Sequence, residues 1–223
     1  MLAKAYRWFI TPHFGKLKID GRFIASMCLL LLAVVLAFWR QNTSQWIRLG
    51  AMCFSSIGDI ILMNAWNIPK RLFKKRSIIA GGASFSIGHL LYAKAFWILI
   101  PQMLNNPISL VMSMFGTMIL LVIVIEFFLS YHLKLDKLYR FSFIFTLYFL
   151  FIAVNGTCAG MLVLSSNMNT VNAIILILGI CSFIFSDTII KLEKTAGLAS
   201  ETWRFNVWAT YIIAQVALIC VHV

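Results

Sequence analysis

The sequence predicts an all-α, polytopic transmembrane helix bundle. Of its 223 residues, 61% are hydrophobic and only 12% are charged, and the mean hydropathy is +0.91. A soluble domain with this balance would have too few polar residues to cover its surface. Seven apolar stretches and a strongly asymmetric distribution of Lys and Arg complete the prediction. We expect residues 1–21 to form a basic N-terminal segment and residues 22–223 to form one transmembrane helical domain.

Each expected span is an apolar run of about 17 to 25 residues, the length that crosses roughly 30 Å of hydrocarbon. Residues that break or cap helices separate the runs: 64–69 contains Asn and Pro, Pro101 and Pro107 bracket another connection, and 165–170 is rich in Ser and Asn. The seven expected spans are residues 22–39, 46–65, 77–100, 108–130, 141–164, 171–190 and 205–222.

The N-terminal segment admits two interpretations. Residues 6–14 are apolar and aromatic but too short to span, so we expect an interfacial helix there. A basic region before an apolar run is also typical of a signal peptide. The flank 39–42, Trp-Arg-Gln-Asn, lacks a small-residue cleavage site, which favours a retained membrane anchor.

The distribution of basic residues predicts the orientation, because Lys and Arg in short loops stay in the cytoplasm. They are concentrated before the first span and in the second, fourth and sixth connections, with five in residues 70–76 alone. The alternate connections hold Arg40 and Arg48 in one and no Lys or Arg in the other two. We therefore expect the N-terminus and residues 66–76 in the cytoplasm and His222 on the other side.

The net charge of +12 does not indicate a nucleic-acid partner, because the basic residues lie between apolar runs and not on a solvated face. The five cysteines are distributed among the spans without a CxxC pair, so no redox or metal site is expected. We expect them to be small apolar residues buried against neighbouring helices.

Ionisable residues inside the spans are the strongest functional signal, since each is costly at depth unless it is paired, wetted or neutral. Asp59, His89 and Asp187 are expected in the inner half of the membrane, where they can share one cavity. Glu126 lies near the inner end of its span, which favours a merely interfacial position, and Lys94 can reach the outer surface.

Helical spacing places further polar residues beside these groups. Ser55 and Ser56 stand one turn before Asp59, and Tyr92 follows His89 by three residues. Simpler interpretations remain open: Asp187 can pair with Lys191 on its own helix. A lone His89 can serve only as an interhelical hydrogen-bonding residue, as can Tyr148, Asn155, Thr157, Tyr211 and Gln215.

This ordered set resembles the YhhN family of membrane lysoplasmalogenases over about residues 50–219. The matching positions are Gly58-Asp59, His89 with Tyr92, Ser186-Asp187, and Tyr211 with Gln215. The family usually has eight spans, and the usual first span is here reduced to residues 6–14. Asn155 stands where a Met is common.

The resemblance implies hydrolysis of the sn-1 vinyl ether of a lysoplasmalogen to a fatty aldehyde and glycerophosphocholine or glycerophosphoethanolamine. It implies a lysophospholipid substrate, no cofactor, and a multi-pass protein of the bacterial inner membrane. Two carboxyl groups in unlike environments can divide the acid and base roles. The expected catalytic residues are Asp59, Asp187 and His89, and the expected substrate-binding residues are Tyr92, Tyr148, Ser186, Tyr211 and Gln215. The basic residues 70–76 are expected to suit a phosphate head group.

Two other classes of function compete with this hypothesis. A small transporter could use the same aspartates and histidine as a proton relay, but transporters often show inverted repeats and broken helices, and the sequence shows neither. A structural membrane protein would leave the cost of the intramembrane carboxyl groups unexplained.

Overall fold

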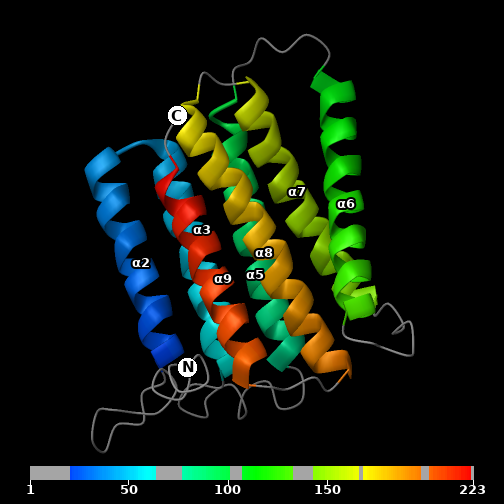
Figure 1. Ribbon diagram of the computed structural model, residues 1–223. Coiled ribbons are helices and arrows are strands. Elements are labelled where there is room, and N and C mark those ends of the chain that lie inside the picture. The colour runs from blue at the N-terminus through cyan, green and yellow to red at the C-terminus, as the bar shows by residue number, and fades with distance from the viewer. Residues whose placement is uncertain are drawn as a thin grey trace, which may run out of the picture.

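The computed structural model describes residues 21–63, 77–100, 107–132, 143–165, 168–196 and 201–221, and every regular element in these ranges is a helix. The seven helices confirm the seven predicted spans (Figure 1). They are α2 (Gly21–Arg40), α3 (Thr43–Met63), α5 (Ser77–Trp97), α6 (Pro107–His132), α7 (Phe143–Ser165), α8 (Thr170–Ala196) and α9 (Glu201–Cys220). The expected interfacial helix at 6–14 and the basic residues 70–76 lie outside the described residues.

Three of these helices are long and apolar enough by themselves to cross a membrane: α2, α3, and α8 as far as Ile190. Shorter apolar stretches lie in α6, α7 and α9. The backbone of α8 continues to Ala196, beyond the predicted end at 190, because Lys and Glu are good helix formers that extend a helix into the polar region. The chain is thus a helical membrane protein whose α2 begins and whose α9 ends at opposite ends of the bundle (Figure 1).

Local sequence explains where several helices begin and end. Gln41 has a positive φ of 49° and its N–H bonds to the carbonyl of Ala37, which ends α2 in a left-handed cap. The next residue, Asn42, accepts a hydrogen bond from the Gln45 N–H through its side chain and so caps α3. Pro107 begins α6, where its missing N–H costs nothing. Turn and capping residues therefore set the register of the α2–α3 hairpin.

Close packing is most extensive between α3 and α5 and between α8 and α9. In the first pair a Cβ on Gly88 would lie 3.0 Å from the Ser55 hydroxyl, and in the second a Cβ on Gly179 would lie 2.5 Å from the Cβ of Ala217. Glycines at these points let the helix backbones approach closely, as membrane helices often do. Helix α6 packs on α7 and α8 and stands at the edge of the bundle (Figure 1).

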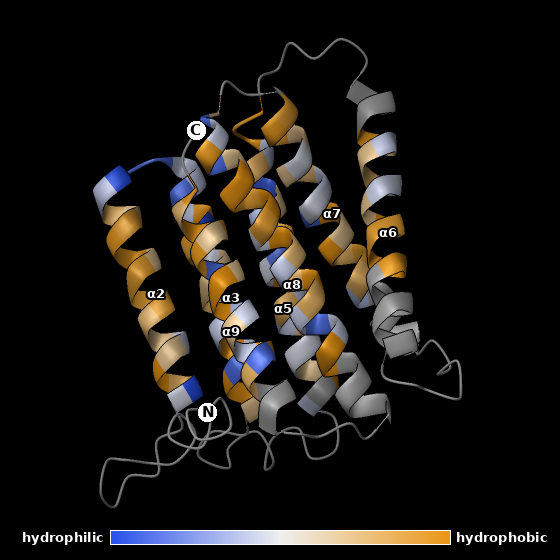
Figure 2. Ribbon diagram, in the orientation of Figure 1, coloured by the Kyte–Doolittle hydropathy of each residue, from blue (hydrophilic) through white to orange (hydrophobic). Residues whose placement is uncertain are grey.

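The outward faces of the helices are apolar (Figure 2). Leu31, Phe38, Leu120 and Leu164 are each 60% or more exposed. Water would make such a surface aggregate, whereas lipid tails solvate it. Of the cysteines, Cys28 is exposed and the other four are partly buried. The expectation that all five are buried is wrong for Cys28, because Cys28 lies on a different face of α2 from its buried residues Leu29, Ala33 and Leu36.

Three polar side chains hold the end of α9 to the α2–α3 hairpin. Arg40, Gln45 and Arg48 donate hydrogen bonds of 3.0, 3.1 and 2.5 Å to the backbone carbonyls of residues 220, 219 and 221. The guanidinium carbon of Arg48 also lies 5.1 Å from the centre of the Phe96 ring. The last carbonyls of a helix lack partners in their own helix and carry its partial negative charge. Arg40 and Arg48, the basic residues on the side predicted to be outside, thus have a structural role.

Candidate functional site

Two carboxyl groups are buried among the side chains that the structure describes. The first belongs to Asp59, which lies one turn before the end of α3 and is 3% exposed. Its Oδ2 accepts hydrogen bonds from the Ser26 hydroxyl of α2 at 2.7 Å and from the Tyr211 hydroxyl of α9 at 2.9 Å. Ser56 lies 3.3 Å from Ser26 between their hydroxyl oxygens. Side chains of three helices therefore meet at Asp59. The two hydrogen bonds to its carboxyl group offset the cost of burying that group.

The second carboxyl group, Asp187 of α8, is 8% exposed. Its Oδ2 accepts a hydrogen bond of 2.6 Å from the Tyr148 hydroxyl of α7. That hydroxyl oxygen also lies 3.4 Å from Nε2 of His89 on α5, and the other ring nitrogen, Nδ1, lies 3.2 Å from Nδ2 of Asn155 on α7. Asp187 is thus the end of a hydrogen-bonded chain of four residues.

The directions of these bonds define the histidine tautomer. Because the Tyr148 proton is directed to Asp187, its oxygen accepts from His89, which requires a proton on Nε2. Nδ1 is then the acceptor for the Asn155 amide. The chain runs from Asn155 through His89 and Tyr148 to Asp187, with every donor directed toward the carboxyl group.

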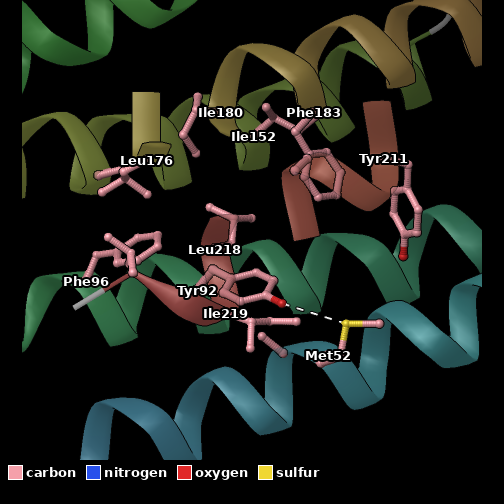
Figure 3. Packing of buried hydrophobic residues seen from close by; sticks show 14 of the residues in the cluster. Met52, Tyr92, Phe96, Ile152, Leu176, Ile180, Phe183, Tyr211, Leu218 and Ile219 are labelled. Carbon is pink, nitrogen blue, oxygen red and sulfur yellow. Dashed lines mark hydrogen bonds between the residues drawn. The ribbon is translucent and has the colours of Figure 1, made fainter. Parts of the chain in front are cut away.

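The hydrogen-bonded groups of Asp59 and Asp187 meet at one aromatic ring, that of Phe183 on α8. Phe183 stands between their partners: its ring centre lies 4.5 Å from that of His89 and 5.7 Å from that of Tyr211. Figure 3 shows Phe183 beside Tyr211 in the apolar core. The carboxyl groups therefore belong to one polar region enclosed by aromatic rings, with different partners on each side.

A close contact between helices supports the Asp59 side of this region. A Cβ on Gly58 would lie 2.6 Å from the ring of Phe85 on α5, so only glycine lets the ring lie against α3 at this point. Phe85 in turn packs edge-on against Tyr211 at 6.1 Å between ring centres. Gly58 thus allows the ring that packs against Tyr211 to lie directly over α3, next to Asp59.

Tyr92 and Gln215, one turn farther along α5 and α9, form a separate pair. The Tyr92 hydroxyl donates to Gln215 Oε1 at 2.8 Å. The same hydroxyl also lies 3.9 Å from the Met52 sulfur (Figure 3). Gln215 Nε2 and Asn155 Oδ1 are buried and find no hydrogen-bond partner among the described residues. A buried polar atom without a partner is costly to the fold.

The remaining predicted residues are placed as follows. The Ser186 hydroxyl donates to the Phe183 carbonyl at 3.0 Å and lies 3.5 Å from Asp187 Oδ1. Lys94 is exposed on α5. The side chains of Glu126 and Lys191 lie outside the described residues. Within the part of the chain that the structure describes, no group of three or more His, Cys, Asp or Glu side chains could hold a metal ion.

Sequence reasoning missed Ser26 and gave Asn155 only a generic role. Ser26 is the one hydroxyl residue in 21–40, and that isolation within an apolar run was a usable signal. Its partner could not be inferred, because Asp59 lies on another helix. Phe183 could not be predicted as part of the site, since the sequence of an apolar span does not distinguish a ring between two polar groups from a ring that faces lipid.

A family model described as the YhhN family matches residues 22–221. Comparison with curated proteins and with experimentally solved structures finds no match. The matched range contains all seven helices but the first residue of α2, and it contains both carboxyl groups with all their partners. The chain is therefore a helical membrane protein that belongs to the YhhN family.

Proposed function

We propose that this protein is a lysoplasmalogenase, which hydrolyses the vinyl ether of a lysoplasmalogen to a fatty aldehyde and a glycerophospho-alcohol. The observation that carries the proposal is the pair of buried carboxyl groups, Asp59 and Asp187, held by different partners on the two sides of the Phe183 ring. Vinyl ether hydrolysis needs an acid and a base on the two sides of one reacting group, as glycoside hydrolysis does.

The reaction divides into two proton-transfer stages. First, an acid adds a proton to the alkenyl carbon farther from the ether oxygen, which leaves an oxocarbenium ion. Water then adds to the carbon beside the oxygen and gives one proton to a base. In the second stage the hemiacetal breaks: the glycerol oxygen takes the proton from that base, and the hemiacetal hydroxyl returns a proton to the acid. The sum consumes one water and regenerates both groups.

We assign the acid to Asp187. Its Oδ2 accepts from Tyr148, so a proton on this carboxyl group resides on Oδ1 and is directed away from that bond. The chain through Tyr148, His89 and Asn155 fixes the orientation of the carboxyl group and connects it to a second ionisable side chain. A positioned acid of this kind contributes about 10²- to 10⁴-fold to a rate.

We assign the base to Asp59. Ser26 and Tyr211 both donate to Oδ2, so neither occupies Oδ1. The carboxylate can then stabilise the oxocarbenium ion and take the proton from water. The rings of Phe85 and Phe183 beside Tyr211 keep this region poor in water, which strengthens the attraction between a carboxylate and a developing cation.

The transporter hypothesis receives less support from the fold. Transporters commonly carry substrate at helices broken near the midplane, whereas α3, α5, α8 and α9, which carry the ionisable residues and their partners, are continuous over their described lengths. Proton movement along the Asp187 chain remains the outcome to measure if hydrolysis fails. We further propose that the protein resides in the cytoplasmic membrane of a bacterium.

The direct test is aldehyde release by the purified protein in detergent. Lysoplasmenylcholine and lysoplasmenylethanolamine are the substrates, and the saturated 1-alkyl lysophospholipid is the matched control because it lacks the double bond that accepts the proton. We expect aldehyde from the first two and competitive inhibition by the third. A folded sample that releases no aldehyde from either substrate refutes the proposal, as does cleavage of the alkyl ether at a comparable rate.

A further inference from the structure

Arg22 lies on the same helix as Ser26, which donates to Asp59, and is closer to the end of the bundle that the sequence predicts to face the cytoplasm. It is in the first turn of α2 and is half-buried. Its guanidinium carbon lies 5.9 Å from the centre of the Trp208 ring on α9. Trp208 packs edge-on against Tyr211 at 5.3 Å between ring centres. A contiguous set of side chains therefore joins Arg22 to the tyrosine that donates to Asp59.

The depth of Arg22 in the membrane can be compared with that of Ser26. The two residues are one helical turn apart on α2, which is roughly 6 Å along the axis, and Ser26 donates to Asp59. Arg22 is thus a fixed cation one turn closer to the membrane surface than the carboxyl group assigned to the reacting end of the substrate.

We propose that Arg22 binds the phosphodiester of the lysophospholipid and so determines both its orientation and the requirement for a phosphate. This inference rests on the proposed function and names the group that holds the head of the substrate. The glycerol backbone separates the sn-1 ether oxygen from the phosphate by about one helical turn when extended. A substrate with its ether at Asp59 and Asp187 therefore brings its phosphate to the level of Arg22.

The chemistry of the two side chains suits this role. A guanidinium donates two parallel hydrogen bonds to a phosphate, and its charge does not depend on pH in the working range. Stacking on Trp208 limits the conformations of Arg22, which reduces the entropy lost when the phosphate binds. The head group would then lie at the membrane surface and the alkenyl chain in the bilayer, as in a free lysophospholipid.

The proposal predicts a selectivity that the carboxyl groups cannot provide. Choline and ethanolamine substrates share the phosphodiester, so Arg22 should serve both equally. A 1-alkenylglycerol presents the same vinyl ether without the phosphate. Its affinity for the protein should therefore not depend on Arg22.

The kinetic test compares Arg22→Gln and Arg22→Lys with the wild type on these two kinds of substrate. For lysoplasmenylcholine we expect Arg22→Gln to raise KM on the order of tenfold to a hundredfold, the size of a lost charge-assisted hydrogen bond, with kcat nearly unchanged. The KM of Arg22→Lys for this substrate should lie between those of the wild type and Arg22→Gln. Neither variant should change the KM for 1-alkenylglycerol. Lys94→Gln, which removes an exposed cation from α5, is the matched control and should behave as the wild type.

A binding test is independent of turnover. The fluorescence of the protein, to which Trp208 contributes, is titrated with the 1-alkyl lysophosphocholine, with 1-alkylglycerol and with inorganic phosphate. We expect Arg22→Gln to weaken binding of the alkyl phospholipid alone, and inorganic phosphate to bind far more weakly than the lipid. If wild type releases no aldehyde but this difference persists, the lysophospholipid site stands and only the hydrolase proposal fails.

Three results would overturn the assignment of Arg22. The first is equal binding of the alkyl phospholipid by the wild type and Arg22→Gln. The second is an equal loss for the phosphate-free lipid, which would make Arg22 a structural residue. The third is binding of inorganic phosphate as tight as that of the lipid, which would indicate a site for free phosphate.

Discussion

The Tyr148 hydroxyl of α7 donates a hydrogen bond of 2.6 Å to Asp187 of α8, while its oxygen lies 3.4 Å from Nε2 of His89 on α5. One phenol thus connects a buried carboxyl group to a histidine. Because the three residues come from three helices, their relative positions depend on how α5, α7 and α8 pack. Changes at either end of this chain should therefore alter the chemistry more than the fold.

Replacing Tyr148 with Phe tests this chain. The ring keeps its packing against His89 and Phe149, but Asp187 loses its donor and its connection to His89. We expect kcat for lysoplasmenylcholine to fall by about 10- to 100-fold, the effect of leaving a buried carboxyl oxygen without its donor. Thr157→Val, which removes a buried hydroxyl that donates to a carbonyl of the same helix, should retain activity. Equal effects of both changes would contradict a specific role for Tyr148.

The two carboxyl groups should be separately essential. Asp59→Asn and Asp187→Asn keep the size of each side chain but remove the acid or base, so kcat should fall by about 10²- to 10⁴-fold with much of the substrate affinity retained. Solvent deuterium should slow the wild type, because the transferred proton is exchangeable. Full activity in both variants would exclude the two-carboxyl mechanism.

A cationic inhibitor should distinguish the roles of the two aspartates. A lysophospholipid analogue with a secondary amine in place of the vinyl ether resembles the oxocarbenium ion in charge. If Asp59 stabilises that cation, Asp59→Asn should bind the analogue at least tenfold more weakly, and Asp187→Asn should lose less affinity. The measurement is inhibitor binding by calorimetry in detergent. The reverse order would exchange the assignments of acid and base.

Ser26 and Tyr211 donate to the same oxygen of Asp59 and should be energetically coupled. We expect Ser26→Ala and Tyr211→Phe each to lower kcat/KM by about tenfold, with the double variant departing from the product of the two, because neighbours that share a partner are not additive. Ser84→Ala removes a buried hydroxyl that donates to the Phe54 carbonyl and is the matched control. Strict additivity with small single effects would show that Asp59 does not need both donors.

Stability should depend on the contact between α8 and α9. A Cβ on Gly179 would lie 2.5 Å from the Cβ of Ala217, which is attached directly to the backbone and cannot rotate away. Gly179→Ala should therefore destabilise the fold by about 1–3 kcal/mol. The double variant Gly179→Ala with Ala217→Gly should recover most of the loss in a thermal melt in detergent. A Cβ on Gly82 would have no neighbour within 4 Å, so Gly82→Ala should not destabilise the fold. If the double variant does not recover stability, Gly179→Ala must clash with a residue other than Ala217.

The orientation predicted from the basic connections is testable by labelling single cysteines in a chain whose native cysteines are replaced. Trp66→Cys should react only from the cytoplasmic side and His222→Cys only from the other side, because Lys and Arg in short loops remain inside. Reaction of His222→Cys from the cytoplasm would mean an even number of spans and a further one in the first 20 residues.

The positions of the helices could be predicted from hydropathy, since a bilayer selects apolar runs of a fixed length and that property is local. The same reasoning identified Asp59, His89 and Asp187, because an ionisable residue in an apolar run is conspicuous without any knowledge of its neighbours. It also identified Tyr148 and Tyr211 as candidates, but as members of a set of polar residues with no assigned partners.

Which polar residues pair with each carboxyl group depends on the packing of the helices and could not be predicted. Ser26 and Tyr211 bond to Asp59, and Tyr148 to Asp187, because of which helices are adjacent and how each is rotated about its axis. Those choices depend on close contacts such as Gly58 against Phe85. Hydropathy cannot encode them, since lipid and a neighbouring helix are equally apolar surroundings for a transmembrane face.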